Sequence, residues 1–127
     1  MEFLNVIAAA AAAFAFGAVW YIGMSKPWMA ASGVTEDQQK AAGPMPFVIG
    51  LLAMVLVAGM MRHLLGTSGV TSVGGGAIAG FGVGAFLITP WVAMNYAFGL
   101  RKPALTLIDG VNSVVGCTII GAVLNLF

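Results

Sequence analysis

The chain has 127 residues, of which 61% are hydrophobic and 7% are charged, whereas a soluble globular domain carries about 25% charged residues. Five Lys and Arg residues against four Asp and Glu residues give a formal net charge of +1, which excludes nucleic acid as a partner. Four membrane crossings need about 20 residues each, so little chain remains for a water-soluble domain. The sequence therefore predicts an all-α integral membrane protein, with its helices in one bundle.

Long segments without charged residues divide the chain. They predict a single four-helix transmembrane domain over residues 1–127, with helices at about 4–24, 46–65, 77–98 and 106–126. The segments are apolar on all sides, which excludes a transmembrane barrel, because barrel strands alternate apolar and polar residues. The glycine-rich stretch at 66–76 is expected to be a loop.

The basic residues set the expected orientation. Four of the five lie in the loops after the first and third predicted helices, namely Lys26, Lys40, Arg101 and Lys102. Cytoplasmic loops carry the excess of Lys and Arg, so we expect these loops in the cytoplasm and both termini outside it. Trp20, Trp28 and Trp91 lie toward the same ends, where aromatic side chains anchor in the interface. Lys-Pro pairs follow both helices, which favours two repeated helical hairpins as one description of the bundle.

The loop at 25–45 is the largest soluble piece. Thr35 and Gln38 have the spacing of a capping box, which predicts a short surface helix that begins after Thr35. The loop is either a solvated connector or a handle for a partner protein.

Glycines recur along the third predicted helix. Gly76, Gly80 and Gly84 are four residues apart and share one face, which lets another helix approach closely. This face either packs on the first helix, which carries Gly17 and several alanines, or mediates self-association and partner docking.

Polar residues follow the glycine stripe. Asn95 lies close to whole helical turns from Gly84 and is expected to face inward. Pro90 is expected to kink this helix, with Thr89 satisfying a freed carbonyl group. Two interpretations remain open, a polar ligand site or hydrogen bonds that only hold helices together. The candidate polar site comprises Tyr21, Asn95, Tyr96 and Asp109.

Asp109 is the only acid placed near a span where it could matter. Thr106 lies three residues before it, which is the spacing of a helix cap, and Arg101 and Lys102 are close enough in sequence for an ion pair. The alternative is a proton- or cation-coupled role, because intramembrane acids are functional by default.

The residues needed for catalysis or metal binding are scarce. His63 and Cys117 are each the single residue of their type, and neither has companions at metal-ligand spacing. No set of nucleophile, base and stabilising group can be assembled. We therefore expect no enzyme activity, no metal and no cofactor.

A resemblance to a known family rests on short motifs along the chain. They are Gly17-Ala-Val-Trp-Tyr21, Lys26-Pro-Trp28, Asn95-Tyr-Ala-Phe98, Arg101-Lys-Pro103 and Leu107-Ile-Asp-Gly110. Over essentially the whole chain, the sequence resembles the bacterial family of small four-helix membrane proteins catalogued as domain of unknown function 1761. The resemblance implies a bacterial integral membrane protein with these four helices and no assigned activity.

These patterns favour a non-enzymatic scaffold or accessory subunit of a bacterial inner-membrane complex. We expect it to lie in the lipid bilayer and to associate through its glycine-lined helix faces, either as a homo-oligomer or with other membrane-protein subunits. The alternative is a small homo-oligomeric transporter or channel, in which Asn95 and Asp109 are the candidate residues.

Overall fold

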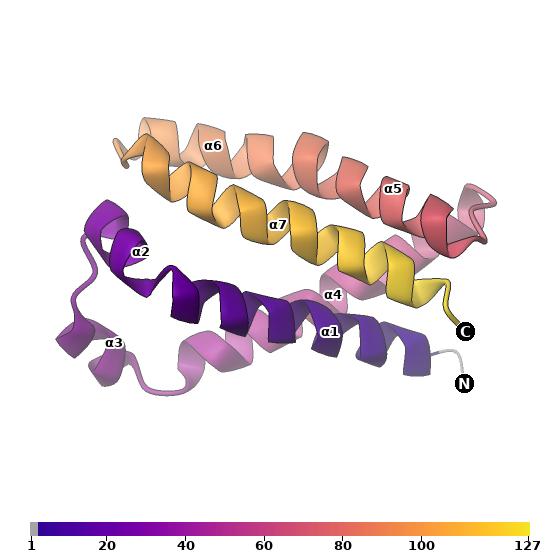
Figure 1. Cartoon of the computed structure of the whole chain (residues 1–127), viewed down its shortest axis with the longest axis horizontal. Coiled ribbons are helices and arrows are strands. Elements are labelled where there is room, and N and C mark those ends of the chain that lie inside the picture. The colour runs from indigo at the N-terminus through magenta and orange to yellow at the C-terminus, as the bar shows by residue number, and fades with distance from the viewer. Residues whose placement is uncertain (1–2) are drawn as a thin grey trace.

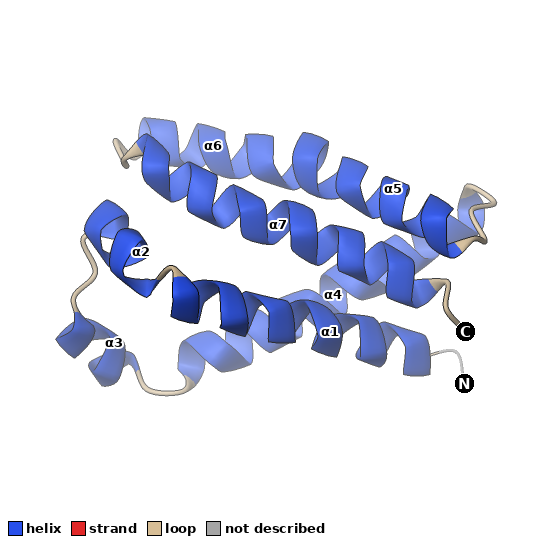
Figure 2. Ribbon diagram, in the orientation of Figure 1, coloured by secondary structure: helices blue, strands red, loops and turns tan. Residues whose placement is uncertain are grey.

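The computed structural model describes residues 3–127 and is helical along most of them, with no strand in that range (Figures 1 and 2). The elements in chain order are α1 (Leu4–Gly23), α2 (Ser25–Ser32), α3 (Glu36–Ala42), α4 (Met45–Thr67), α5 (Val73–Val83), the π-helical turn η1 (Gly84–Ile88), α6 (Thr89–Phe98) and α7 (Pro103–Leu124). Four helical segments are long and apolar enough to cross a membrane, namely α1, α4, α5 to α6, and α7. The all-α bundle predicted from the sequence is confirmed.

The two ends of the bundle differ in charge. α1 begins and α7 ends at one end, whereas α2, α3 and the turn between α6 and α7 lie at the other (Figure 1). We call the second end the basic end, because its elements and loops carry Lys26, Lys40, Arg101 and Lys102. The polar segment at 25–45 folds there into α2 and α3. Thr35 and Gln38 form the predicted capping box at the start of α3.

α7 is the central helix, because it packs against α1, α4, α5 and α6. The buried core is built mainly of small and aliphatic side chains: Val6, Ala9, Ala10, Ala13, Ala58, Met61, Leu65, Cys117, Ile120 and Leu124. Large apolar side chains such as Leu56, Ile78 and Phe86 face outward instead. Lipid tails are as apolar as these side chains, so close helix packing holds such a bundle together. The chain is a multi-pass membrane protein.

The third span starts earlier than the sequence predicts, at Val73 rather than at about residue 77. Ser72 caps it, because its hydroxyl accepts a hydrogen bond of 2.9 Å from the backbone N–H of Gly75. The side chain of Asn125 also donates to the carbonyl groups of Val70 and Ser72. Glycines that are typical of a loop are therefore helical here, because a cap and the end of α7 fix the preceding turn.

The same span is interrupted by η1, just before Pro90. Proline has no N–H and its ring collides with the preceding turn, and a π-helical turn is one way for a helix to absorb such a defect. The hydroxyl of Thr89 is buried and has no hydrogen-bond partner within residues 3–127. The prediction that Thr89 satisfies a freed carbonyl group is therefore wrong.

The turn between α6 and α7 places Leu100 in a left-handed conformation, with φ of 58°. This conformation lets the N–H of Arg101 donate to the carbonyl group of Tyr96 at 2.8 Å, so that α6 ends and the chain reverses. This conformation costs an L-residue about 1–2 kcal/mol and costs glycine almost nothing.

We expect Leu100→Gly to raise the free energy of unfolding by about 0.5–1 kcal/mol, since relief of strain is partly offset by the greater freedom of glycine when unfolded. Unfolding in increasing mole fractions of sodium dodecyl sulfate measures it. Leu100→Ala is the control, because it removes the same side chain and keeps the strain. Equal stability of the two variants would contradict the expectation.

Candidate polar site at the basic end

The carboxylate of Asp109 joins three membrane spans. Its Oδ1 atom accepts a hydrogen bond of 2.5 Å from the hydroxyl of Tyr21 in α1, and its Oδ2 atom accepts one of 2.5 Å from the hydroxyl of Tyr96 in α6. Asp109 itself lies half-buried in α7. Each carboxylate oxygen thus ties one helix to α7.

The position of Asp109 in α7 differs from the sequence expectation. α7 begins at Pro103, with Lys102 in the capping position, so Thr106 lies inside the first turn and Asp109 lies beyond it. The expected ion pair with Arg101 or Lys102 is also wrong. Within residues 3–127, the one ion pair joins Glu36 and Lys40, with 3.5 Å between Nζ and Oε1.

Arg101 and Lys102 contact α2 instead. The guanidinium of Arg101 donates to the carbonyl group of Ser32 at 3.2 Å, and the ammonium of Lys102 donates to that of Ala30 at 3.4 Å. These carbonyl groups lie in the last turn of α2, where the helix dipole favours positive charge. The two basic residues therefore hold α2 against the turn between α6 and α7.

The π turn decides which residue of α6 faces Asp109. Asn95 follows Gly84 by eleven residues, which is about three turns of an unbroken α-helix. A π turn adds one residue, so every later side chain moves by about 100° around the helix. Tyr96 takes the inward position, while Asn95 is exposed and its side chain forms no hydrogen bond within residues 3–127. The prediction that Asn95 faces inward is therefore wrong.

The three predicted tryptophan anchors have different surroundings. Trp20 donates its indole N–H to the carbonyl group of Ile108 at 3.0 Å, which adds a second link between α1 and α7. Trp28 of α2 packs edge to face against the ring of Tyr21, with 6.3 Å between centroids. Trp91 is 66% exposed on the outside of α6. Only the first two belong to the polar site.

Comparison with known families adds one finding. The family described as Protein of unknown function (DUF1761) matches residues 4–125. The chain belongs to this family. No curated protein and no solved structure matches this DUF1761 chain.

The motifs that carry the family resemblance meet at the polar site of this DUF1761 chain. They come from α1 and α2 and from α6 and α7, two pairs of helices that are far apart in sequence and adjacent at the basic end (Figure 1). The side chains joined there are Trp20, Tyr21, Trp28, Tyr96 and Asp109. We refer to these five residues as the aromatic–carboxylate cluster.

Sequence reasoning missed one contributor to this cluster, Gly110. It is buried, and a Cβ atom there would lie 3.0 Å from the methyl group of Thr89. The absence of a side chain lets α6 approach α7 closely enough for Tyr96 to reach Asp109. The position of Gly110 next to the acid was the available signal.

The glycine stripe packs on α7, and not on the first helix. A Cβ atom at Gly80 would overlap the backbone carbonyl group of Cys117, and one at Gly76 would overlap that of Gly121. At Gly84 it would lie 2.6 Å from the carbonyl oxygen of Ser113. The stripe is thus filled by backbone of the same chain, and no other helix has room there.

Gly17 is also close to α7. A Cβ atom at Gly17 would lie 3.3 Å from the side-chain oxygen of Asn112. The four glycines predicted to pack helices, Gly17, Gly76, Gly80 and Gly84, therefore all face α7 within one chain. Association through these glycine faces, as expected from the sequence, has no free surface to use.

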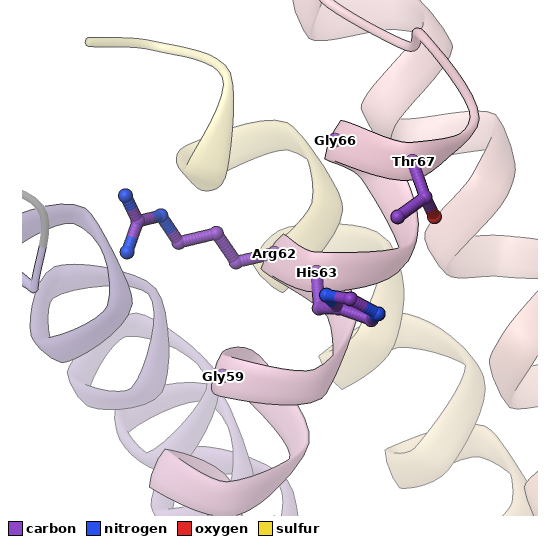
Figure 3. Close-up of a pocket in the computed structure, with 5 residues that line it drawn as sticks. All are labelled: Gly59, Arg62, His63, Gly66 and Thr67. Carbon is purple, nitrogen blue, oxygen red and sulfur yellow. The ribbon is translucent and has the colours of Figure 1, made fainter.

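The end of α4 that lies away from the basic end carries a second group of polar residues, drawn in Figure 3. A shallow depression there is lined by Gly59, Arg62, His63, Gly66 and Thr67, all from one helix. The guanidinium of Arg62 lies 5.9 Å from the ring centre of Phe3, and the imidazole of His63 points to another side of α4 (Figure 3). These side chains diverge, so they do not form a site that surrounds a ligand.

Proposed function

We propose that this DUF1761 protein is a non-enzymatic accessory subunit of a bacterial inner-membrane complex, with the basic end in the cytoplasm and both termini outside. The main support is the construction of the basic end. Asp109 fixes α1, α6 and α7 to one another. Arg101 and Lys102 fix α2 to the turn between α6 and α7. Three residues separate α2 from α3, so α3 follows this framework directly in the chain.

α3 is the surface that we assign to a partner subunit. None of its residues is buried, and it is bounded by glycines with positive φ, Gly33 and Gly43. Its ion pair between Glu36 and Lys40 is largely exposed, and such pairs contribute little to stability. Charged residues on an exposed helix that stabilises nothing else are available for recognition across an interface.

Native mass spectrometry of protein gently solubilised from its own membrane tests the proposal. We expect a second copy or a different subunit to remain bound. The double variant Glu36→Gln and Asp37→Asn keeps the Thr35 cap and should release that partner. His63→Gln, at the other end of the bundle, is the matched control and should keep it. A strictly monomeric wild-type protein with no co-purifying subunit would overturn the proposal.

A second candidate function is proton-linked transport by a homo-oligomer, and Asp109 is what supports it. Intramembrane acids are costly and often mark ion pathways, and this one has no basic partner within residues 3–127. Further along α7 from Asp109, the buried residues Cys117 and Ile120 fill the core of the single chain. A proton pathway would therefore need several copies of the chain.

Flux assays in proteoliposomes distinguish the two functions. If transport is proton-coupled, Asp109→Asn should abolish substrate flux while the protein stays folded. Flux that is unchanged in this variant, or absent from the wild type, rejects coupling through Asp109 and leaves the subunit proposal standing.

A further inference from the structure

We propose that the outward groove between α6 and α7 at the basic end binds an anionic phospholipid, with its phosphate on Arg101 and one acyl chain along the groove. This site is separate from α3 and from the aromatic–carboxylate cluster. Its lining residues are Ala93, Ala97, Arg101, Pro103, Thr106 and Leu107.

The shape of the groove follows from the spacing of small residues. Ala93 and Ala97 are one turn apart on α6, and Arg101 follows at the same interval past the end of that helix. Alanine side chains are short, so they leave a trough beside α7, where Leu107 is 71% exposed. An apolar trough on the outside of a membrane-spanning bundle matches an acyl chain.

The charge at the mouth of the groove selects the headgroup. Arg101 is exposed and donates one N–H to Ser32, whereas a guanidinium has five N–H donors arranged to bind phosphate in pairs. Both oxygens of Asp109 already accept hydrogen bonds from tyrosines. Since no acid within residues 3–127 pairs with Arg101 or Lys102, these cations match an anionic headgroup at a membrane surface.

Exposed apolar side chains just before Arg101 indicate that Arg101 lies at the depth of the lipid bilayer. Phe98, the last residue of α6, is 86% exposed, and Leu100 in the turn that follows is 91% exposed. Exposing such large apolar side chains to water is unfavourable, and their free energy is lower in the acyl region of a bilayer. The guanidinium follows immediately after them, so it reaches the level where phosphates lie.

Native mass spectrometry from micelles with equal amounts of phosphatidylglycerol and phosphatidylcholine, matched in acyl chains, tests this site. We expect wild-type protein to retain phosphatidylglycerol preferentially, and Arg101→Gln to reduce that preference about fivefold, as for one basic residue at a membrane surface. Arg62→Gln, which removes a cation at the opposite end, should leave it unchanged.

A second variant separates the groove from the charge. Ala97→Phe fills the trough and keeps Arg101, so it should also reduce retention of phosphatidylglycerol if the acyl chain lies there. Thermal unfolding and helicity by circular dichroism identify any variant that fails to fold. The proposal is overturned if wild type shows no preference, if Arg62→Gln matches Arg101→Gln, if folded Ala97→Phe retains lipid normally, or if a cross-link from position 97 captures a protein helix instead.

Discussion

Replacing Gly80 by alanine is expected to destabilise the bundle by about 1–3 kcal/mol or more, the cost of overpacking a closely packed interior. The added Cβ would overlap the backbone carbonyl group of Cys117. A carbonyl group in the middle of a helix cannot rotate away, so α5 and α7 must separate along their length. Unfolding in sodium dodecyl sulfate, followed by circular dichroism, measures the loss.

Gly82 provides the matched control two residues away. A Cβ atom there meets nothing within 4 Å, because this position faces away from α7. We expect Gly82→Ala to be neutral or to stabilise the helix by up to about 1 kcal/mol, as alanine is the better helix former. Similar losses in both variants would mean that α5 does not pack on α7 as described.

The glycine face could be predicted from the sequence, but the helix that packs on it could not. Spacing alone placed Gly76, Gly80 and Gly84 on one face, because a helix has 3.6 residues per turn. Spacing does not say which helix fills that face, because α1 and α7 both offer small residues and the choice depends on the order of helices around the bundle. Gly121, which meets Gly76 from α7, is visible as a partner only once that order is known.

The polar site illustrates a second limit. Tyr21, Tyr96 and Asp109 were identifiable from the sequence because polar side chains are few in these segments and costly in lipid. The prediction that Asn95 faces inward is wrong because it assumes one constant helical period through Pro90. The defect is absorbed by a π turn at Gly84–Ile88, and no local pattern distinguishes that from a simple kink.

The rotation of the α6 side chains by the π turn explains why the Asp109 carboxylate can bind both α1 and α6. A tyrosine hydroxyl extends further from its backbone than an asparagine amide, so Tyr96 reaches across to α7, where Gly110 permits close approach. Two O–H donors are best matched by two acceptor oxygens, which a carboxylate supplies and an amide does not. The acid is thus suited to its position by the number of its acceptors as well as by its charge.

Replacing Asp109 by alanine is therefore expected to cost about 1–4 kcal/mol of unfolding free energy. Interhelical hydrogen bonds in membranes contribute about 0.6–2 kcal/mol each, and two tyrosine hydroxyls lose their acceptor together. Asp109→Asn keeps one acceptor oxygen and should lose about half as much. Unfolding in sodium dodecyl sulfate gives each free energy, and Asp37→Ala on exposed α3 controls for loss of a charge.

Double-mutant cycles then determine whether the links act through the carboxylate. Tyr21→Phe and Tyr96→Phe should each destabilise the wild-type protein by about 1 kcal/mol and should have almost no effect once Asp109 is alanine. If either tyrosine variant costs as much without the carboxylate as with it, that hydroxyl has another partner and Asp109 does not join the three spans. If both effects disappear, the Asp109 carboxylate is the common anchor of α1 and α6. A partner bound at the basic end would then depend on this carboxylate for the arrangement of the helices, without contacting it.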